Sequence, residues 1–309
     1  SFYANDNEIV MTVSSLKQNI DSTLKIAEEM LFMPKFDQED FDLVKKEQMD
    51  GITNQATQAT AIAGNVFSKL LYGSELTVSM PSSGTSETVA SITLDDVKNY
   101  YKNFSGFNAV LAVSGDIDQA SALKKLNFLT KLQSAGTMPL AKYKLPEIDK
   151  TRIYFVDKKG APQSEIRVGN LSLAYDATSE YFKSTIMNYA FAGVFNSRVN
   201  YILREIKGYT YGARGGFYGN KFVGPYMINA GVRANATDSS VVIIMDELKK
   251  YATSGVTAEE LEFTKNAMAQ ADALKYESPM QKLGFVKRII DFDLDKTFVT
   301  KQGEIIKTI

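Results

Sequence analysis

The sequence repeats one pattern of elements at a distance of 220 residues, and this repeat most constrains the fold. The ten residues that begin at Phe36 match the ten that begin at Val256. In both places a predicted strand and an amphipathic helix come before the match, and a capped helix follows it. Capping signals alone are common, so the shared order of elements is what favours a duplication.

We therefore expect two homologous domains, of which the first is incomplete. The expected parts are the back of a first domain (1–135), a linker that contains Gly136, Pro139 and Pro146 (136–150), and a second domain (151–309). The counterpart of Thr93 would fall just past Ile309, which indicates that the chain is a fragment of a longer protein.

The periodicity of apolar residues predicts an α+β fold. An antiparallel-rich sheet with helices packed on one face is expected in each domain, because strands are followed by runs of helices. The first domain is expected to hold strands at 7–13 and 110–114, helices at about 15–33, 37–55, 61–71, 93–102 and 118–132, and a loop at 74–91. Ser15 to Gln18 is interpreted as a capping box, and Thr93 with Asp96 as a helix cap. The second is expected to hold strands at 152–157, 164–173, 209–218 and 224–234, and helices at 179–194, 197–207, 238–253, 258–277 and 280–291.

The chain contains neither His nor Cys, which limits its chemistry more than any motif does. Hydrolytic zinc sites nearly always use imidazole ligands, and serine and cysteine hydrolases use His as a base. No metal site or catalytic residue is therefore expected in this segment. The formal net charge of −1 gives no reason to expect nucleic acid. No apolar run approaches the roughly 20 residues that cross a bilayer, so membrane insertion is not expected.

Two neighbouring motifs carry a family resemblance. The segment from Asn188 to Val199, followed by Leu203 to Gly212, resembles the second-domain signature of the pitrilysin/insulinase (inverzincin) zinc metallopeptidases. Leu71-Tyr72-Gly73, the segment 92–101 and Val113-Ser114-Gly115-Asp116 are similar to further family motifs, in the same order. The resemblance implies a metallopeptidase/LuxS-like fold, and two halves that close around a peptide chamber.

The resemblance also implies that the zinc site lies elsewhere. Family members hold zinc with His-x-x-Glu-His and a distant Glu, and this chain has no His. The position of the distant Glu falls at about Ile52, which is not a ligand. Zinc is thus expected in a missing catalytic half, which belongs to the same chain or to a partner subunit.

Four residues are candidate contacts for a peptide substrate. By resemblance, Arg204 and Tyr211 bind the substrate backbone and stabilise the oxyanion, while Asn188 and Gln163 are secondary candidates. Each also has a purely structural interpretation. Arg204 could form a salt bridge with Glu205, Tyr211 could be a half-buried strand aromatic, Asn188 a polar residue on a helix surface, and Gln163 an ordinary strand start.

Three functions stay open at this point. The chain is expected to be the non-catalytic half of a zinc endopeptidase. The alternatives are a non-peptidase scaffold subunit of the same superfamily, or a peptide-binding module. The lack of Cys fits a protein of the bacterial periplasm or cell envelope.

Overall fold

The computed structural model describes all residues except 6–7, 103–105, 107–108, 133–143 and 275. Contacts divide the chain into two compact units, residues 1–57 with 75–145 and residues 58–74 with 146–309. The α+β class expected from the sequence is confirmed. Most of the expected linker lies outside the described residues, and the assignment of homologous domains stays a prediction.

The first unit is mainly helical. Its strands β1 (Phe2–Ala4) and β2 (Ile9–Met11) form a small antiparallel pair. Its helices are η1 (Lys17–Asn19), α1 (Ile20–Phe32), α2 (Gln38–Thr57), η2 (Thr77–Ser79), α4 (Ser86–Ser91), α5 (Leu94–Lys102), α6 (Gln119–Lys125) and η3 (Asn127–Lys131). The cap expected at Thr93 is confirmed, because its Oγ1 accepts the Asp96 N–H at 3.2 Å and its own N–H donates to the Asp96 carboxylate at 2.8 Å.

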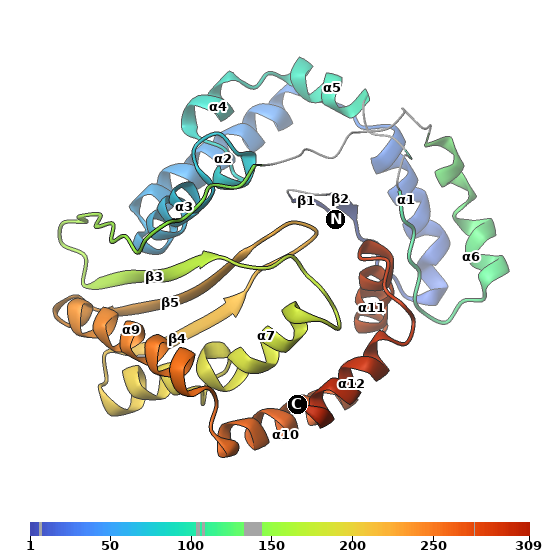
Figure 1. Cartoon of the computed structure of the whole chain (residues 1–309). Coiled ribbons are helices and arrows are strands. Elements are labelled where there is room, and N and C mark those ends of the chain that lie inside the picture. The colour runs from blue at the N-terminus through green and yellow to red at the C-terminus, as the bar shows by residue number, and fades with distance from the viewer. Residues whose placement is uncertain (6–7, 103–105, 107–108, 133–143, 275) are drawn as a thin grey trace. The chain divides into compact units, whose positions relative to one another are not determined.

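The second unit is built around a three-stranded antiparallel sheet in the order β3-β5-β4. The strands are β3 (Gln163–Leu171), β4 (Thr210–Phe217) and β5 (Pro225–Arg233). The helices are α3 (Ala59–Tyr72), α7 (Glu180–Asn188), η4 (Tyr189–Gly193), α8 (Arg198–Asn200), η5 (Tyr201–Ile206), η6 (Ala234–Ala236), α9 (Thr237–Ser254), α10 (Ala258–Leu274), α11 (Pro279–Asp291) and α12 (Phe298–Thr308). Helix α9 lies against β3 and β5, and α3 packs on β3 (Figure 1).

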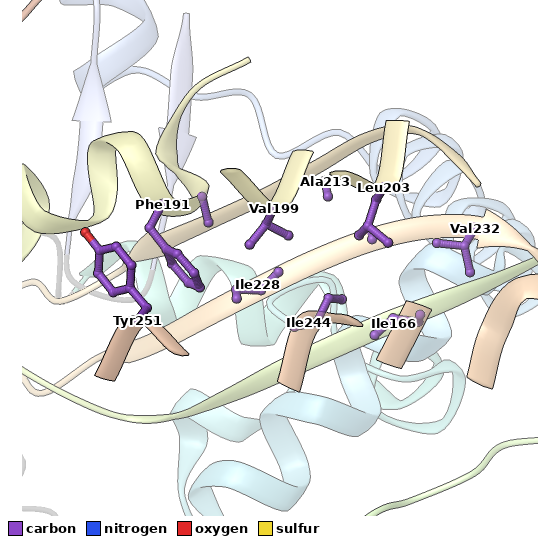
Figure 2. Close-up of a cluster of buried hydrophobic side chains, with 11 residues drawn as sticks. Ile166, Phe191, Val199, Leu203, Ala213, Ile228, Val232, Ile244 and Tyr251 are labelled. Carbon is purple, nitrogen blue, oxygen red and sulfur yellow. The ribbon is translucent and has the colours of Figure 1, made fainter. Parts of the chain in front are cut away.

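The core of the second unit lies between this sheet and its helices. Alternate residues of β5, Ile228, Ala230 and Val232, are almost completely buried, as a half-buried strand requires. Side chains from the strands, from η5 and from α9 meet there, among them Leu203 and Ile244 (Figure 2). This cluster positions the segment that carries Arg204 and Tyr211.

The helices keep the spacing of the sequence repeat. Helix α2 begins at Gln38 and α10 at Ala258, and α3 begins at Ala59 and α11 at Pro279. Each pair is 220 residues apart. The buried face of α9 includes Ile244 and Tyr251, and the same offset leads to Leu24 and Leu31 on the predicted face of α1.

Several expectations were wrong. Residues 110–114 and 152–157 form no strand, because no described strand pairs with either segment. Both segments are rich in apolar residues, which is why strands were expected there. The expected loop 74–91 contains α4, which has its own capping box at Thr85 and Thr88. The expected capping box from Ser15 to Gln18 is absent; the chain enters α1 through the 3₁₀ turn η1 without a side-chain cap.

Strand β1 and helix α12 were not expected from the sequence. Among the described residues, no helix is both long enough and apolar enough to cross a membrane.

Candidate functional site

Arg204 lies on a widened helical turn that ends the helical segment before β4. The main-chain N–H of Lys207 donates to the carbonyl of Ile202 at 3.0 Å, an i→i+5 bond that defines η5 as a π-helix. Leu203 is fully buried in the core, while the Arg204 side chain is 33% exposed. The helix thus anchors on Leu203 and presents Arg204 at the surface.

The guanidinium of Arg204 has two neighbours. Its Nη1 donates to Glu205 Oε1 at 2.8 Å, so the salt bridge considered from the sequence is present. Its Cζ also lies 4.3 Å from the centroid of the Phe195 ring, within the range of a cation–π contact. Arg214 approaches the same ring, with its Cζ at 5.7 Å. Phe195 therefore holds two arginines close together.

Gly208 turns the chain from η5 into β4. It adopts φ +60°, a left-handed conformation that favours glycine. The N–H of Gly208 donates to the Arg204 carbonyl at 3.1 Å, and the N–H of Tyr209 donates to the Leu203 carbonyl at 2.8 Å. Gly208 therefore ends the helical segment, which agrees with the helix expected at 197–207.

Tyr211 projects from a β-bulge at the start of β4. Thr210 pairs with Val232 and Ala213 with Ala230, so two residues, Tyr211 and Gly212, lie opposite one residue of β5. The extra residue pushes Tyr211 outward, and the residue is 89% exposed. Its hydroxyl has no hydrogen-bond partner within the described parts of the chain. The half-buried strand aromatic considered from the sequence is therefore wrong.

Thr210 stabilises this bulge. Its Oγ1 donates to the carbonyl of Gly231 at 2.7 Å or of Gly212 at 2.9 Å, and accepts the Gly212 N–H at 3.0 Å. These bonds satisfy main-chain groups that the bulge removes from the regular ladder.

Asn188 and Gln163, the secondary candidates, lie on α7 and β3. Asn188 is 5% exposed; its Nδ2 donates to the Gly215 carbonyl at 2.7 Å and its Oδ1 accepts from the Tyr226 hydroxyl at 3.0 Å. The interpretation of Asn188 as a surface residue is wrong, since it ties α7 to β4 and β5. Gln163 begins β3 and pairs with Arg233, as an ordinary strand start does.

Arg204 and Tyr211 lie on an open surface. A cavity of about 340 Å³ lies elsewhere in the second unit, where Tyr175, Phe292 and Asp295 are among its lining residues. Neither Arg204 nor Tyr211 lines it. Any enclosed chamber around these two residues would need a partner surface.

A partly buried ion pair behind the site was missed from the sequence. Arg198 Nε and Nη2 donate to the two carboxylate oxygens of Glu260 at 2.8 and 2.5 Å, which joins α8 to the start of α10. Burial opposes ionisation of Glu260, but hydrogen bonds from Arg198 and Thr257 outweigh it, and the net effect lowers its pKa. Sequence spacing gives no signal for a contact between residues so far apart.

The described residues contain no group of three or more His, Cys, Asp or Glu side chains that could hold a metal ion. The surface around Arg204 and Tyr211 offers arginine guanidinium groups, a tyrosine hydroxyl and the half-exposed ring of Phe195. Such groups bind peptides and anions through hydrogen bonds and ring contacts.

The fold is an α+β domain in which helices cover a three-stranded antiparallel sheet, and it matches solved M16 inactive domains. Residues 91–268 match the family model described as "Peptidase M16 inactive domain". The chain belongs to this family, the pitrilysin/insulinase peptidases, and this segment is of its inactive, non-catalytic type.

Curated relatives carry two different descriptions. "Non-peptidase homolog YmxG" of Helicobacter pylori is 24% identical over 287 residues, which cover 89% of this chain and 63% of the relative. "Uncharacterized zinc protease YmxG" of Bacillus subtilis is 23% identical over 272 residues, covering 87% and 64%. The chain therefore spans less than two thirds of the length of either relative.

Solved structures agree on the fold. A peptidase M16 inactive domain from Pseudomonas fluorescens superposes with a TM-score of 0.82 at 22% identity, covering 96% of this chain and 70% of that one. A chain of complex III2 from Candida albicans gives a TM-score of 0.68 at 14% identity, covering 96% and 72%. At these identities the likeness establishes the fold alone.

Proposed function

We propose that this chain is the non-catalytic half of a zinc-dependent endopeptidase, in which Arg204 and Tyr211 bind the peptide backbone beside the reacting carbonyl. The observation that carries the proposal is the outward placement of both donors, one on each side of the turn between η5 and β4. The π-turn presents Arg204, and the bulge presents Tyr211 with a hydroxyl free of partners in the described structure.

The chemistry suits contact with a developing oxyanion. A guanidinium stays charged at any physiological pH, and a phenol is a neutral donor at pH 7. The ion pair with Glu205 orients the guanidinium and leaves further N–H groups available, because Arg has five donors. Zinc and the general base would come from a catalytic half that carries His-x-x-Glu-His, in the same chain or in a partner subunit.

The test is peptide cleavage by the complete protein together with its catalytic half. Arg204→Gln and Tyr211→Phe should each lower kcat by about 100-fold, with a smaller change in KM, because donors to an oxyanion act mainly in the transition state. Matched controls are Arg152→Gln and Tyr218→Phe, which remove the same groups from exposed positions outside the π-turn and bulge. Unchanged turnover in both site variants would exclude the proposed role.

A scaffold subunit is the second candidate. It is favoured by the non-peptidase description of the Helicobacter pylori relative and by the similarity to a chain of complex III2. The discriminating observation is the sequence of the complete protein and of its stable partners. If none contains His-x-x-Glu-His, and the purified assembly cleaves no peptide with added zinc, the scaffold assignment replaces the endopeptidase.

A further inference from the structure

One face of the three-stranded sheet lies opposite the main core, and α3 packs on its β3 side. Residues alternate along a strand, so the neighbours of Ile166 in β3 and of Ile228 and Ala230 in β5 point to the opposite face. Residues that pair directly across strands share a face. The register therefore assigns the following to this second face: Gln163, Glu165, Arg167 and Gly169 of β3, Met227, Asn229, Gly231 and Arg233 of β5, and Arg214 and Gly216 of β4.

A row of three polar residues crosses this face. Arg167 pairs with Asn229 on one side, and Arg214 pairs with Asn229 on the other. Directly paired residues of antiparallel strands lie about 5 Å apart. Two arginine side chains thus start on either side of one asparagine.

Positive charge exceeds negative charge on this face. Its single carboxylate, Glu165, accepts from Arg167 Nη1 at 3.1 Å, and both side chains are nearly buried, at 15% and 12% exposure. Arg214 has only a long bond, from its Nη1 to the Ala213 carbonyl at 3.4 Å. No carboxylate within the described residues lies at ion-pair distance from Arg214. The amide of Asn229 likewise has no hydrogen-bond partner there.

Arg214 is also continuous with the Arg204 surface. Both guanidinium groups contact the ring of Phe195, which is half exposed. Their two Cζ atoms are therefore no farther apart than the sum of their distances to the ring centroid. The ring restricts the rotamers of Arg214 without neutralising its charge. A guanidinium held in this way has lost part of its conformational freedom before any ligand arrives.

We infer that Arg214, with Asn229 beside it, is a subsite for a carboxylate group of a bound peptide. The inference rests on the proposed peptide-binding function and adds a side-chain or chain-end preference to it. Arg binds carboxylates through two parallel N–H···O bonds, and the Asn amide supplies a further N–H donor. The carboxylate could belong to an Asp or Glu side chain or to the C-terminus, which are the same chemistry from two sources.

Calorimetry with three short extended peptides of one sequence separates these sources. The first has a central Glu and an amidated C-terminus, the second a central Gln and an amidated C-terminus, and the third a central Gln and a free C-terminal carboxylate. The wild-type chain should bind the first, the third or both about tenfold more tightly than the second, the scale of a charge-assisted hydrogen-bonded pair.

Arg214→Gln should remove that preference while leaving the affinity for the uncharged peptide nearly unchanged. Arg214→Lys keeps the charge and the aliphatic stem but loses the planar fork, so it should retain part of the preference and guards against a folding defect. Arg152→Gln, which removes an equal charge outside the sheet, should leave all three affinities unchanged.

The outcomes separate the two proposals. A preference for carboxylate peptides that survives Arg214→Gln, or no preference in the wild type, overturns the Arg214 subsite. Arg204→Gln and Tyr211→Phe report on the proposed function through kcat in the cleavage assay, and they should leave the carboxylate preference intact. If the wild type binds none of the peptides, both proposals fail.

Discussion

Helices α1 and α2 of the first unit repeat the order and spacing of α9 and α10 of the second, yet the two units bury very different amounts of apolar surface. In the second unit, Ile244 and Tyr251 of α9 pack in a cluster of eleven buried residues. In the described part of the first unit, α1 buries Ala27 and Leu31, whereas Ile26 and Met30 remain 59% and 49% exposed. The difference follows from the sheet, because α9 covers a three-stranded sheet, whereas the described residues of the first unit form only the short β1-β2 pair.

The largest difference in stability between the units is expected from a matched pair of core substitutions, one in each unit. Ile244→Ala empties a fully buried position and should destabilise the second unit by about 3 kcal/mol. Leu24→Ala, at the corresponding position of α1, should cost about 1 kcal/mol or less because that side chain is only partly buried. Hydrogen exchange resolved by segment measures each unit separately. Equal losses would show that the first unit has a comparable core.

The Arg198–Glu260 ion pair exists only in the second unit and should have the next largest effect. Arg198→Gln should cost about 2–3 kcal/mol, because it leaves a partly buried carboxylate without its charged partner. The pKa of Glu260 is lowered on folding, so its contribution to stability is complete above the ordinary value of 4.5 and is lost as the pH falls through the folded-state pKa.

Denaturant unfolding from pH 7 downward checks both parts of this prediction. The wild type should lose stability below about pH 4.5 more steeply than Arg198→Gln does. A parallel pH dependence in the two proteins would contradict the assignment to Glu260.

Helix caps should affect both units about equally, because a cap acts locally. Asp37 Oδ1 accepts the Glu39 N–H at 2.9 Å, and Thr257 Oγ1 accepts the Glu260 N–H at 3.2 Å, each at the start of the corresponding helix. Asp37→Ala and Thr257→Ala should each cost about 1 kcal/mol. Exchange protection of the first turns of α2 and α10 measures the effect. A loss confined to one of the helices would contradict the correspondence between them.

The exposed segments should show the smallest effect on stability. Ile153 and Phe155 are 86% and 83% exposed, so replacing both with Ser should change the unfolding free energy by less than about 0.5 kcal/mol. The same change should reduce self-association measured by light scattering, because exposed apolar side chains on extended chain promote it. Thr151→Ser, beside this segment, is the control and should leave scattering unchanged.

Local signals predicted the elements well, and long-range contacts explain what they missed. The cap at Thr93, the helix expected at 258–277 and the strand β5 depend on neighbours within a few residues. The strands expected at 110–114 and 152–157 failed because a strand needs a partner, which periodicity does not supply.

In the candidate site, too, local signals were readable from the sequence and long-range contacts were not. The motif located Arg204 and Tyr211, and the pair Arg204–Glu205 follows from adjacency. The burial of Asn188 and the row from Arg167 through Asn229 to Arg214 depend on strand register and tertiary packing, which one sequence does not specify. The cross-strand row was therefore found only in three dimensions.

The joint between η5 and β4 has a consequence for engineering by insertion or deletion. The π-turn and the bulge each accommodate one residue more than a regular helix or ladder would. Deleting one residue from either element should restore regular geometry there. It should also rotate the chain that follows the deletion relative to the chain that precedes it. Arg204 and Tyr211 would then leave the positions that the π-turn and the bulge give them, so chain length in this stretch shapes the surface as much as the side chains do.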